Sequence, residues 1–111
     1  MKVIVVKEDI VTPEIGQIVR VTYGREQNQV AVIIEIIDDR YVLLADGDKR
    51  KYDRPKKKNM NHFEGTPFIS KEVRKSLLET GRVSNGKLRF AVAKYEREVV
   101  TEIEKGDEHS V

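Results

Sequence analysis

The chain has 111 residues, of which 39% are hydrophobic and 36% are charged, and its 21 basic residues nearly balance its 19 acidic ones. This length predicts one domain with a modest core, and the longest apolar run, Val30–Ile34, is far shorter than the roughly 20 residues of a membrane span. The chain contains no cysteine, which excludes disulfides, thiolate catalysis and cysteine zinc sites. The apolar run Val3–Val6 is too short for a secretion signal, so we expect a cytoplasmic location.

Up to about Phe68 the sequence has the periodicity of short β-strands. The β-branched run Val3–Val6 predicts a strand in a leader segment, residues 1–12. Apolar and polar residues alternate over Ile18–Tyr23, which predicts a half-buried strand. After a polar turn, Val30–Ile37 is apolar on both faces except at one glutamate, which is typical of a strand buried on two sides.

Acidic turns separate the next predicted strands. Asp38–Arg40 predicts a turn before a strand at Tyr41–Ala45. The pair Asp46-Gly47 predicts a type I′ hairpin that joins this strand to another at Lys49–Tyr52. Pro55 cannot donate a ladder hydrogen bond, so we expect it to end that strand or to lie on an edge.

Short strands separated by tight turns predict a small five-stranded β-barrel over residues 13–66. The pattern then becomes helical, so the predicted fold is a mainly β barrel with a C-terminal α-helical extension at 67–111, frayed from Gly106 onward. Ser70 is the predicted N-cap of a helix at Lys71–Thr80, with Gly81 following its end. Asn85 is the predicted cap of a second helix, whose apolar stripe is expected to pack on the barrel. The stripe consists of Leu88, Val92, Tyr95, Val99 and Ile103.

The sequence offers little for catalysis. His62 and His109 are its only histidines, and it has no HExxH motif, nucleophile elbow or glycine-rich phosphate loop. The carboxylate groups at 38–39 and 46–48 are explained by the preference of aspartate for turns. We therefore expect no enzyme, no cofactor and no bound metal, and we interpret His62 as a polar or stacking contact.

A basic run is the most informative feature. Between Lys49 and Lys58 there are seven basic residues and one acid, a local charge of +6. Several cations on one face are what the neutralisation of nucleic-acid phosphates requires, whereas the alternative is an edge strand whose lysines prevent aggregation. In the predicted strand, Lys49 and Lys51 share one face, and Arg50 shares the other with a tyrosine. The predicted phosphate contacts are Lys49, Arg50, Lys51, Arg54, Lys56, Lys57 and Lys58, and the rings expected to stack on bases are Tyr52, His62 and Phe63.

Two segments resemble the KOW motif, in which two strands flank a loop that begins with a glycine, here Gly24. They are residues 15–25, IGQIVRVTYGR, and residues 30–36, VAVIIEI. The continuation, with LADG at 44–47 and RPKKKN at 54–59 followed by His62, is similar to short bacterial KOW proteins related to the archaeal and eukaryotic large-subunit ribosomal protein fourteen. The resemblance covers about residues 14–64 and implies a Src-homology-3-like barrel that binds RNA. The loop after Gly24 is less basic than in many KOW motifs. Arg25 is therefore the only residue of this loop for which the resemblance implies a contact with RNA.

We therefore predict a non-catalytic module that binds ribosomal or other structured RNA through a cationic barrel edge, in a translation-associated role. The alternative is a protein-interaction module of a transcription or translation complex, which would use the edge strand or the last helix. A structural ribosomal component is a third interpretation, but the near-neutral charge and the acidic segment Glu102–Glu108 favour an accessory role. No membrane partner is expected, and an unpaired edge strand leaves the oligomeric state open.

Overall fold

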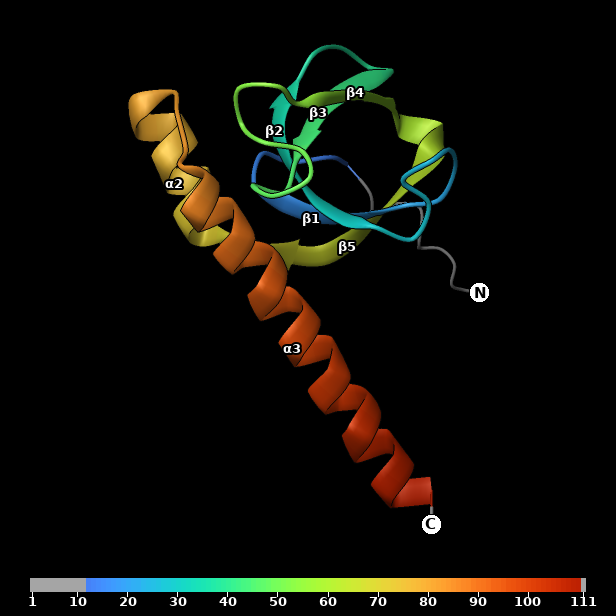
Figure 1. Cartoon of the computed structure of the whole chain (residues 1–111). Coiled ribbons are helices and arrows are strands. Elements are labelled where there is room, and N and C mark those ends of the chain that lie inside the picture. Colours follow the sequence, from blue (N-terminus) through green and yellow to red (C-terminus); the bar gives the residue numbers. More distant parts are fainter. Residues whose placement is uncertain (1–11, 111) are drawn as a thin grey trace.

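The computed structural model describes the backbone of residues 12–110 and the side chains of residues 12–99, so the predicted strand at Val3–Val6 lies outside the described residues. Five strands are followed by two helices, as expected for a mainly β domain with a helical extension (Figure 1). The elements are β1 Gln17–Val21, β2 Val30–Ile36, β3 Tyr41–Ala45, β4 Lys56–Asn59, the 3-10 turn η1 Met60–His62, β5 Phe63–Ile69, α2 Lys71–Thr80 and α3 Asn85–Ser110.

The five strands form one antiparallel sheet in the order β4-β3-β2-β1-β5. The two edge strands, β4 and β5, are neighbours in the chain and are separated only by η1. Because a single 3-10 turn carries the chain from one edge of the sheet to the other, the sheet curls into a barrel-like shape (Figure 1). Register shifts between Gln17 and Val19 in β1 and between Ile33 and Glu35 in β2 add the local bending that such curvature needs.

The curled sheet separates two apolar clusters. The inner cluster, the barrel core, consists of Val19, Val21, Ala31, Ile33, Val42 and Leu44. The other, the helix-side core, consists of Ile18, Val32, Ile34, Ala45, Val73, Val83, Leu88 and Ala91. Residues 31–34 of β2 alternate between the two clusters, which confirms that this part of the strand is buried on both faces. Ile36 and Ile37, at the end of the predicted strand, are exposed.

β1 follows its predicted alternation as far as Val21. Val19 and Val21 enter the barrel core, whereas Arg20 between them is exposed. The strand ends at Val21, whose carbonyl and N–H bond the loop residues Asn28 and Gln29 across the turn. Tyr23, which the alternation places with the apolar residues, therefore lies beyond the strand and is 64% exposed.

The predicted hairpin at Asp46-Gly47 is wrong. The strand that pairs with β3 is β4, and Lys49–Tyr52 forms no strand, so its predicted division into two faces does not apply. Gly47 has a φ of +81° but Asp46 has no positive φ, whereas a type I′ turn needs both. Instead the Asp46 carboxylate accepts hydrogen bonds from two N–H groups of the loop, those of Asp48 at 2.9 Å and Arg50 at 2.8 Å. These bonds favour a wide loop over a tight hairpin.

The loop at residues 46–55 is held by the helices. The N–H of Tyr52 donates to Asn85 Oδ1 at 2.7 Å, and its hydroxyl donates to the carbonyl of Gly81 at 3.0 Å. Arg89 donates to the carbonyl of Gly47 at 2.7 Å. Pro55 precedes β4 rather than ending a strand, and the lysines after it belong to the sheet.

The first helix begins and ends as predicted. The hydroxyl of Ser70 accepts a hydrogen bond from the N–H of Val73 at 3.2 Å, which caps α2. Gly81 follows the helix with a φ of +75° and donates its N–H to the carbonyl of Leu77. β5 continues to Ile69, so the last strand extends past residue 66, where we expected the barrel to end.

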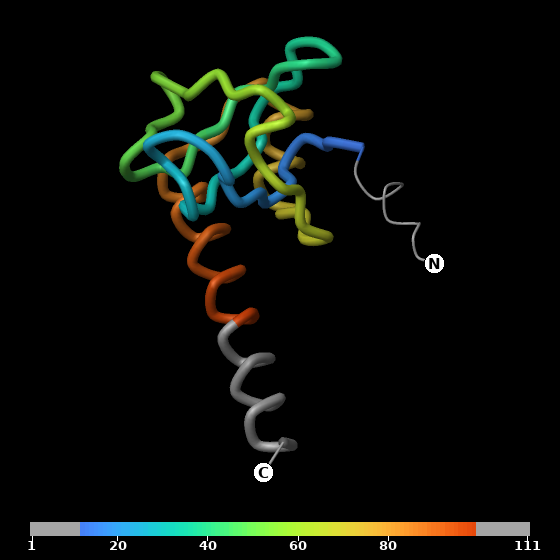
Figure 2. Tube along the Cα trace, turned by 90° about the vertical axis from the view of Figure 1, so that its right-hand side faces the viewer, coloured from blue at the N-terminus to red at the C-terminus, as the bar shows by residue number. Residues whose placement is uncertain are grey.

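The second helix differs from its prediction at both ends. Its cap is Ser84, whose hydroxyl accepts from the N–H of Lys87 at 3.1 Å, and not Asn85, whose side chain binds the loop instead. The helix continues to Ser110, beyond the position where we expected fraying. In Figure 2 the coloured part of α3 begins beside the barrel and runs past its lower edge.

The apolar stripe of α3 packs on the barrel as predicted at Leu88, Val92 and Tyr95, whereas Val99 is half-buried and belongs to neither core. Leu88 is fully buried in the helix-side core, and Val92 and Tyr95 pack against that core. The Tyr95 ring meets the ring of Phe68 edge-on, with a centroid distance of 5.0 Å. Ile103 lies outside the described side chains. Among the described residues, neither helix is both long and apolar enough to cross a membrane.

Candidate nucleic-acid interface

An open depression of about 490 Å³ brings the loop after β1 together with the start of β3 and with β4. It gathers the predicted site residues Arg25, Lys56, Lys57, Lys58 and His62, which the chain supplies from two distant segments. Its lining contains four cations and a single carboxylate, that of Glu26. The remaining lining residues are Tyr23, Gly24, Tyr41 and Asn59.

The alternation of β4 gives its three lysines different environments. Lys57 is exposed, Lys56 is half-buried and Lys58 is buried. The β3–β4 register places Lys57 diagonally opposite Tyr41, and its ammonium lies 4.5 Å from the centroid of the Tyr41 ring. The ring attracts the cation and holds it at the depression. The cationic edge predicted from the sequence is therefore present, but Lys57 is the lysine that it presents most fully.

Lys58 is bound inside the molecule. Its Nζ atom lies 3.2 Å from Oε1 of Glu26 and 3.4 Å from the carbonyl oxygen of Tyr23. The hydrogen bond from Lys58 is the main reason why the pKa of Glu26 is lowered from its ordinary value. Lys58 thus ties the loop after β1 to β4, and this environment differs from the solvent-facing one expected for a phosphate contact.

Two aromatic residues of the depression escaped the sequence analysis. Tyr23 lies against His62, with ring centroids 4.6 Å apart and an interplanar angle of 33°. The N–H of Thr22 donates to the carbonyl of His62 at 2.9 Å, which fixes the two segments side by side. Tyr41 is the second missed residue. The available signal for Tyr23 was its position directly before the glycine that opens the loop.

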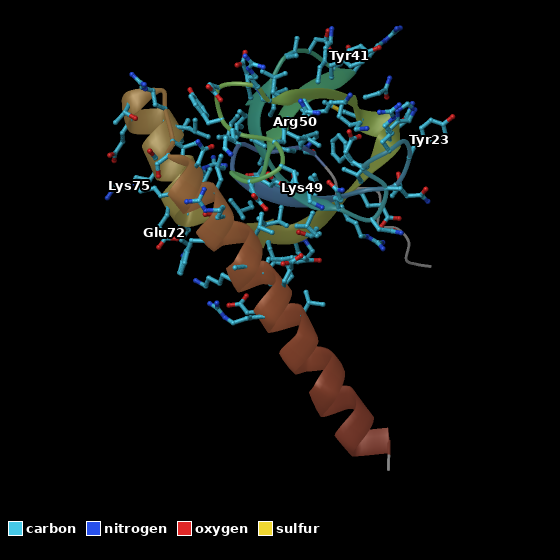
Figure 3. The ribbon with its side chains drawn as sticks, viewed as in Figure 1. Tyr23, Tyr41, Lys49, Arg50, Glu72 and Lys75 are labelled. Carbon is cyan, nitrogen blue, oxygen red and sulfur yellow. The ribbon has the colours of Figure 1, made fainter. Side chains whose placement is uncertain are left out.

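The other predicted residues lie elsewhere. Tyr52 packs against the helix-side core and Phe63 against the barrel core, so neither ring reaches the depression. Lys49 lies away from Tyr23 and Tyr41 (Figure 3). Arg50 lies closer to the depression, because it lines a small pocket of about 30 Å³ together with Glu26, Lys56 and Lys58, which also line the depression. Lys49 lines a second depression, of about 440 Å³, whose charges are mixed. The predicted cations of this loop are Lys49, Arg50, Lys51 and Arg54.

Asp38 and Asp46 stabilise turns by accepting backbone hydrogen bonds, as the sequence predicts. Asp38 Oδ1 accepts hydrogen bonds from the N–H groups of Arg40 at 2.8 Å and Tyr41 at 2.9 Å, and these bonds lower the pKa of Asp38. Asp46 closes its loop in the same way. Within the part of the chain that the structure describes, no three histidine or acidic side chains are grouped as metal ligands.

Comparison with known proteins determines the family. The chain is 42% identical over 71 residues to the putative ribosome-binding protein YbzG of Bacillus subtilis, a match that covers 64% of this chain and 96% of that protein. It is 34% identical over 76 residues to the large ribosomal subunit protein eL14 of Hyperthermus butylicus, covering 61% of this chain and 78% of that protein. The chain belongs to the family of eL14 and its bacterial relatives.

A second eL14, from Pyrobaculum islandicum, is 34% identical to the chain over 53 residues, which are 48% of this chain and 52% of that protein. No family model matches the chain. The resemblance to bacterial relatives of ribosomal protein fourteen is therefore confirmed, whereas the KOW motif itself stays a prediction.

Proposed function

We propose that this chain is a non-catalytic RNA-binding module that associates with ribosomes and contacts ribosomal or other structured RNA through the depression between β4 and the loop after β1. The observation that carries the proposal is the meeting of four cations with a single carboxylate beside the exposed ring of Tyr23. The similarity to YbzG, a putative ribosome-binding protein, and to eL14, a protein of the large ribosomal subunit, supports a ribosomal setting.

The cations of the depression differ in their freedom to bind phosphate. Among residues 12–99, Arg25, Lys56 and Lys57 form no ion pair. The ammonium of Lys57 lies over the Tyr41 ring and attracts the Asp38 carboxylate from a longer distance. Lysine and arginine side chains that face solvent in this way supply most of the affinity of proteins for nucleic-acid backbones. We assign these three as phosphate contacts and Lys58 as the residue that positions the loop.

The loop at 46–55 gives the surface a second part. Lys49, Lys51 and Arg54 are exposed there, in a loop that α3 contacts through Asn85 and Arg89. A backbone that leaves the depression toward the helices would meet these cations next. In this proposal the loop cations bind the flanking phosphates, whereas the depression provides the contacts whose positions are fixed by the fold.

The proposal also covers the type of fold and the boundary between the barrel and the helical extension. A five-stranded curled sheet, whose first two strands flank a loop that opens with Gly24, supports a Src-homology-3-like KOW barrel from the predicted start at residue 13 to the end of β5 at Ile69, followed by the helical extension from α2 onward. The edges disfavour a protein partner that would add a strand. β4 carries lysines, and β5 contains Pro67, which cannot donate to a neighbouring strand.

The test is co-sedimentation with ribosomes and ribosomal subunits at low and then high salt. The variant Lys56→Ala/Lys57→Ala removes two cations of the depression, and Lys71→Ala/Lys75→Ala removes two exposed cations of α2 as a charge-matched control. We expect the first variant to lose the association and the second to retain it. On a defined ribosomal RNA fragment, each lost phosphate contact flattens the logarithmic salt slope by about 0.7–0.9. Equal behaviour of both variants and the wild type would contradict the proposal.

A further inference from the structure

Tyr23 is exposed to an extent that folding does not require. It is 64% exposed, and its ring belongs to neither the barrel core nor the helix-side core. One side of the ring meets His62 at a centroid distance of 4.6 Å, and the depression opens beside it. The molecule therefore presents the face of an aromatic ring to solvent at the point where its cations converge.

The backbone that carries this ring is held by two hydrogen bonds. The carbonyl of Tyr23 accepts a hydrogen bond from the buried Lys58 ammonium at 3.4 Å. The residue before it, Thr22, donates its N–H to the carbonyl of His62 at 2.9 Å. With this backbone held and the His62 ring packed against the Tyr23 ring, the residue loses less conformational freedom when a ligand stacks on it, and such preorganisation favours binding.

Cations line the same depression as the ring. The ammonium of Lys57 lies over the Tyr41 ring, 4.5 Å from its centroid. Arg25 comes from the same loop as Tyr23, two residues further along the chain. The volume of about 490 Å³ falls within the range of about 300–1,000 Å³ that is typical of small-ligand sites. The aromatic ring can stack on a nucleotide base, and the neighbouring cations can bind the phosphate of the same nucleotide.

We propose that this depression binds one unpaired nucleotide of an RNA, with its base stacked on the Tyr23–His62 ring pair and its phosphate between Lys57 and Arg25. The inference rests on the proposed function and narrows it to RNA with an unstacked base. Within an A-form duplex both faces of each base are covered by their neighbours, so an exposed ring has nothing to stack on. Stacking on an aromatic side chain depends little on which base is present, so sequence preference at this nucleotide is weak.

The experiment compares two RNA probes with the same stem. One is a hairpin whose loop carries 2-aminopurine, which reports stacking by its fluorescence, and the other is a blunt duplex. The proteins are the wild type, Tyr23→Ala, Tyr23→Phe and Lys57→Ala. Because Tyr23 lies outside both cores, we expect Tyr23→Ala to keep the thermal unfolding midpoint of the wild type.

We expect the wild type and Tyr23→Phe to bind the hairpin more tightly than the duplex and to change the fluorescence of the loop base. Tyr23→Ala loses about tenfold in affinity for the hairpin, keeps its affinity for the duplex and leaves the fluorescence unchanged. Its salt slope stays that of the wild type, whereas the slope of Lys57→Ala is flatter.

Two results would overturn the inference. If Tyr23→Ala binds both probes like the wild type while Lys57→Ala binds them weakly, the nucleotide site is wrong and the proposed RNA-binding surface stands. If no protein binds either probe and none sediments with ribosomes, both the site and the proposed function are wrong.

Discussion

The Nζ atom of Lys58 in β4 lies 3.2 Å from Oε1 of Glu26 in the loop after β1. The lysine side chain is only 8% exposed and the glutamate side chain 26%. The same ammonium reaches the carbonyl of Tyr23, so one lysine from the basic run joins two segments that form the depression. The pair makes Lys58 a structural residue within a surface that is otherwise built to bind anions.

Removing the carboxylate should destabilise the protein. In Glu26→Gln the buried Lys58 ammonium loses its counter-charge, and we expect the free energy of unfolding in urea to fall by about 1–3 kcal/mol. The matched control is Glu64→Gln, which breaks an exposed pair with Arg20 and should cost less than about 1 kcal/mol. Similar losses in the two variants would show that burial does not strengthen the Lys58 pair.

The stability difference between the wild type and Glu26→Gln should depend on pH. The hydrogen bond from Lys58 lowers the pKa of Glu26 in the folded state below its ordinary value of 4.5. The unfolded state therefore binds the proton more readily, and the stabilisation is complete above pH 4.5 and lost as pH falls through the folded-state pKa. Urea unfolding of both proteins at about pH 7 and about pH 3 measures this. If the wild type exceeds Glu26→Gln in stability by the same amount at both pH values, the ionised Glu26 carboxylate is not the source of the stabilisation.

Elements that depend on local patterns were predictable from the sequence. β3 and α2 have the predicted bounds, because alternation, the Ser70 cap and Gly81 act within a few residues. The loop at 46–55 was not predictable in this way. Its Asp-Gly signal is real, but the Asp46 carboxylate closes a wide loop and Asn85, far away in the sequence, accepts the N–H of Tyr52.

The candidate site also combines residues that the sequence predicts with residues that only the tertiary structure brings together. Charge density alone points to Lys56 and Lys57, and the KOW resemblance adds Arg25, and all three line the depression. Closeness in sequence misled the choice of rings, because Tyr52 and Phe63 pack against cores. Tyr41 enters the site through the β3–β4 register and Tyr23 through the hydrogen bond from Lys58, and the only sequence signal was the position of Tyr23 directly before Gly24.

Two glycines with similar backbones should respond differently to alanine. Gly47 and Gly81 have φ values of +81° and +75°, so each substitution brings the strain of a left-handed residue, about 1–2 kcal/mol. At Gly47 a Cβ would also lie 2.2 Å from the carbonyl oxygen of Asn85, whereas at Gly81 it would meet nothing within 4 Å. We expect Gly47→Ala to lower the free energy of unfolding by at least about 3 kcal/mol, and Gly81→Ala by about 1 kcal/mol. Equal losses in urea unfolding would mean that the loop does not press against α3.

Neighbouring residues at the start of α3 should have separable roles. Ser84 caps the helix through the N–H of Lys87, whereas the amide oxygen of Asn85 accepts the N–H of Tyr52 in the loop. We expect Ser84→Ala to cost about 1 kcal/mol and to speed hydrogen exchange at the Lys87 amide. Asn85→Ala should cost about 1–3 kcal/mol and speed exchange at the Tyr52 amide, because that N–H then has no partner in the protein. If Asn85→Ala instead speeds exchange at Lys87 and leaves Tyr52 protected, Asn85 is the helix cap and the loop is held by other contacts.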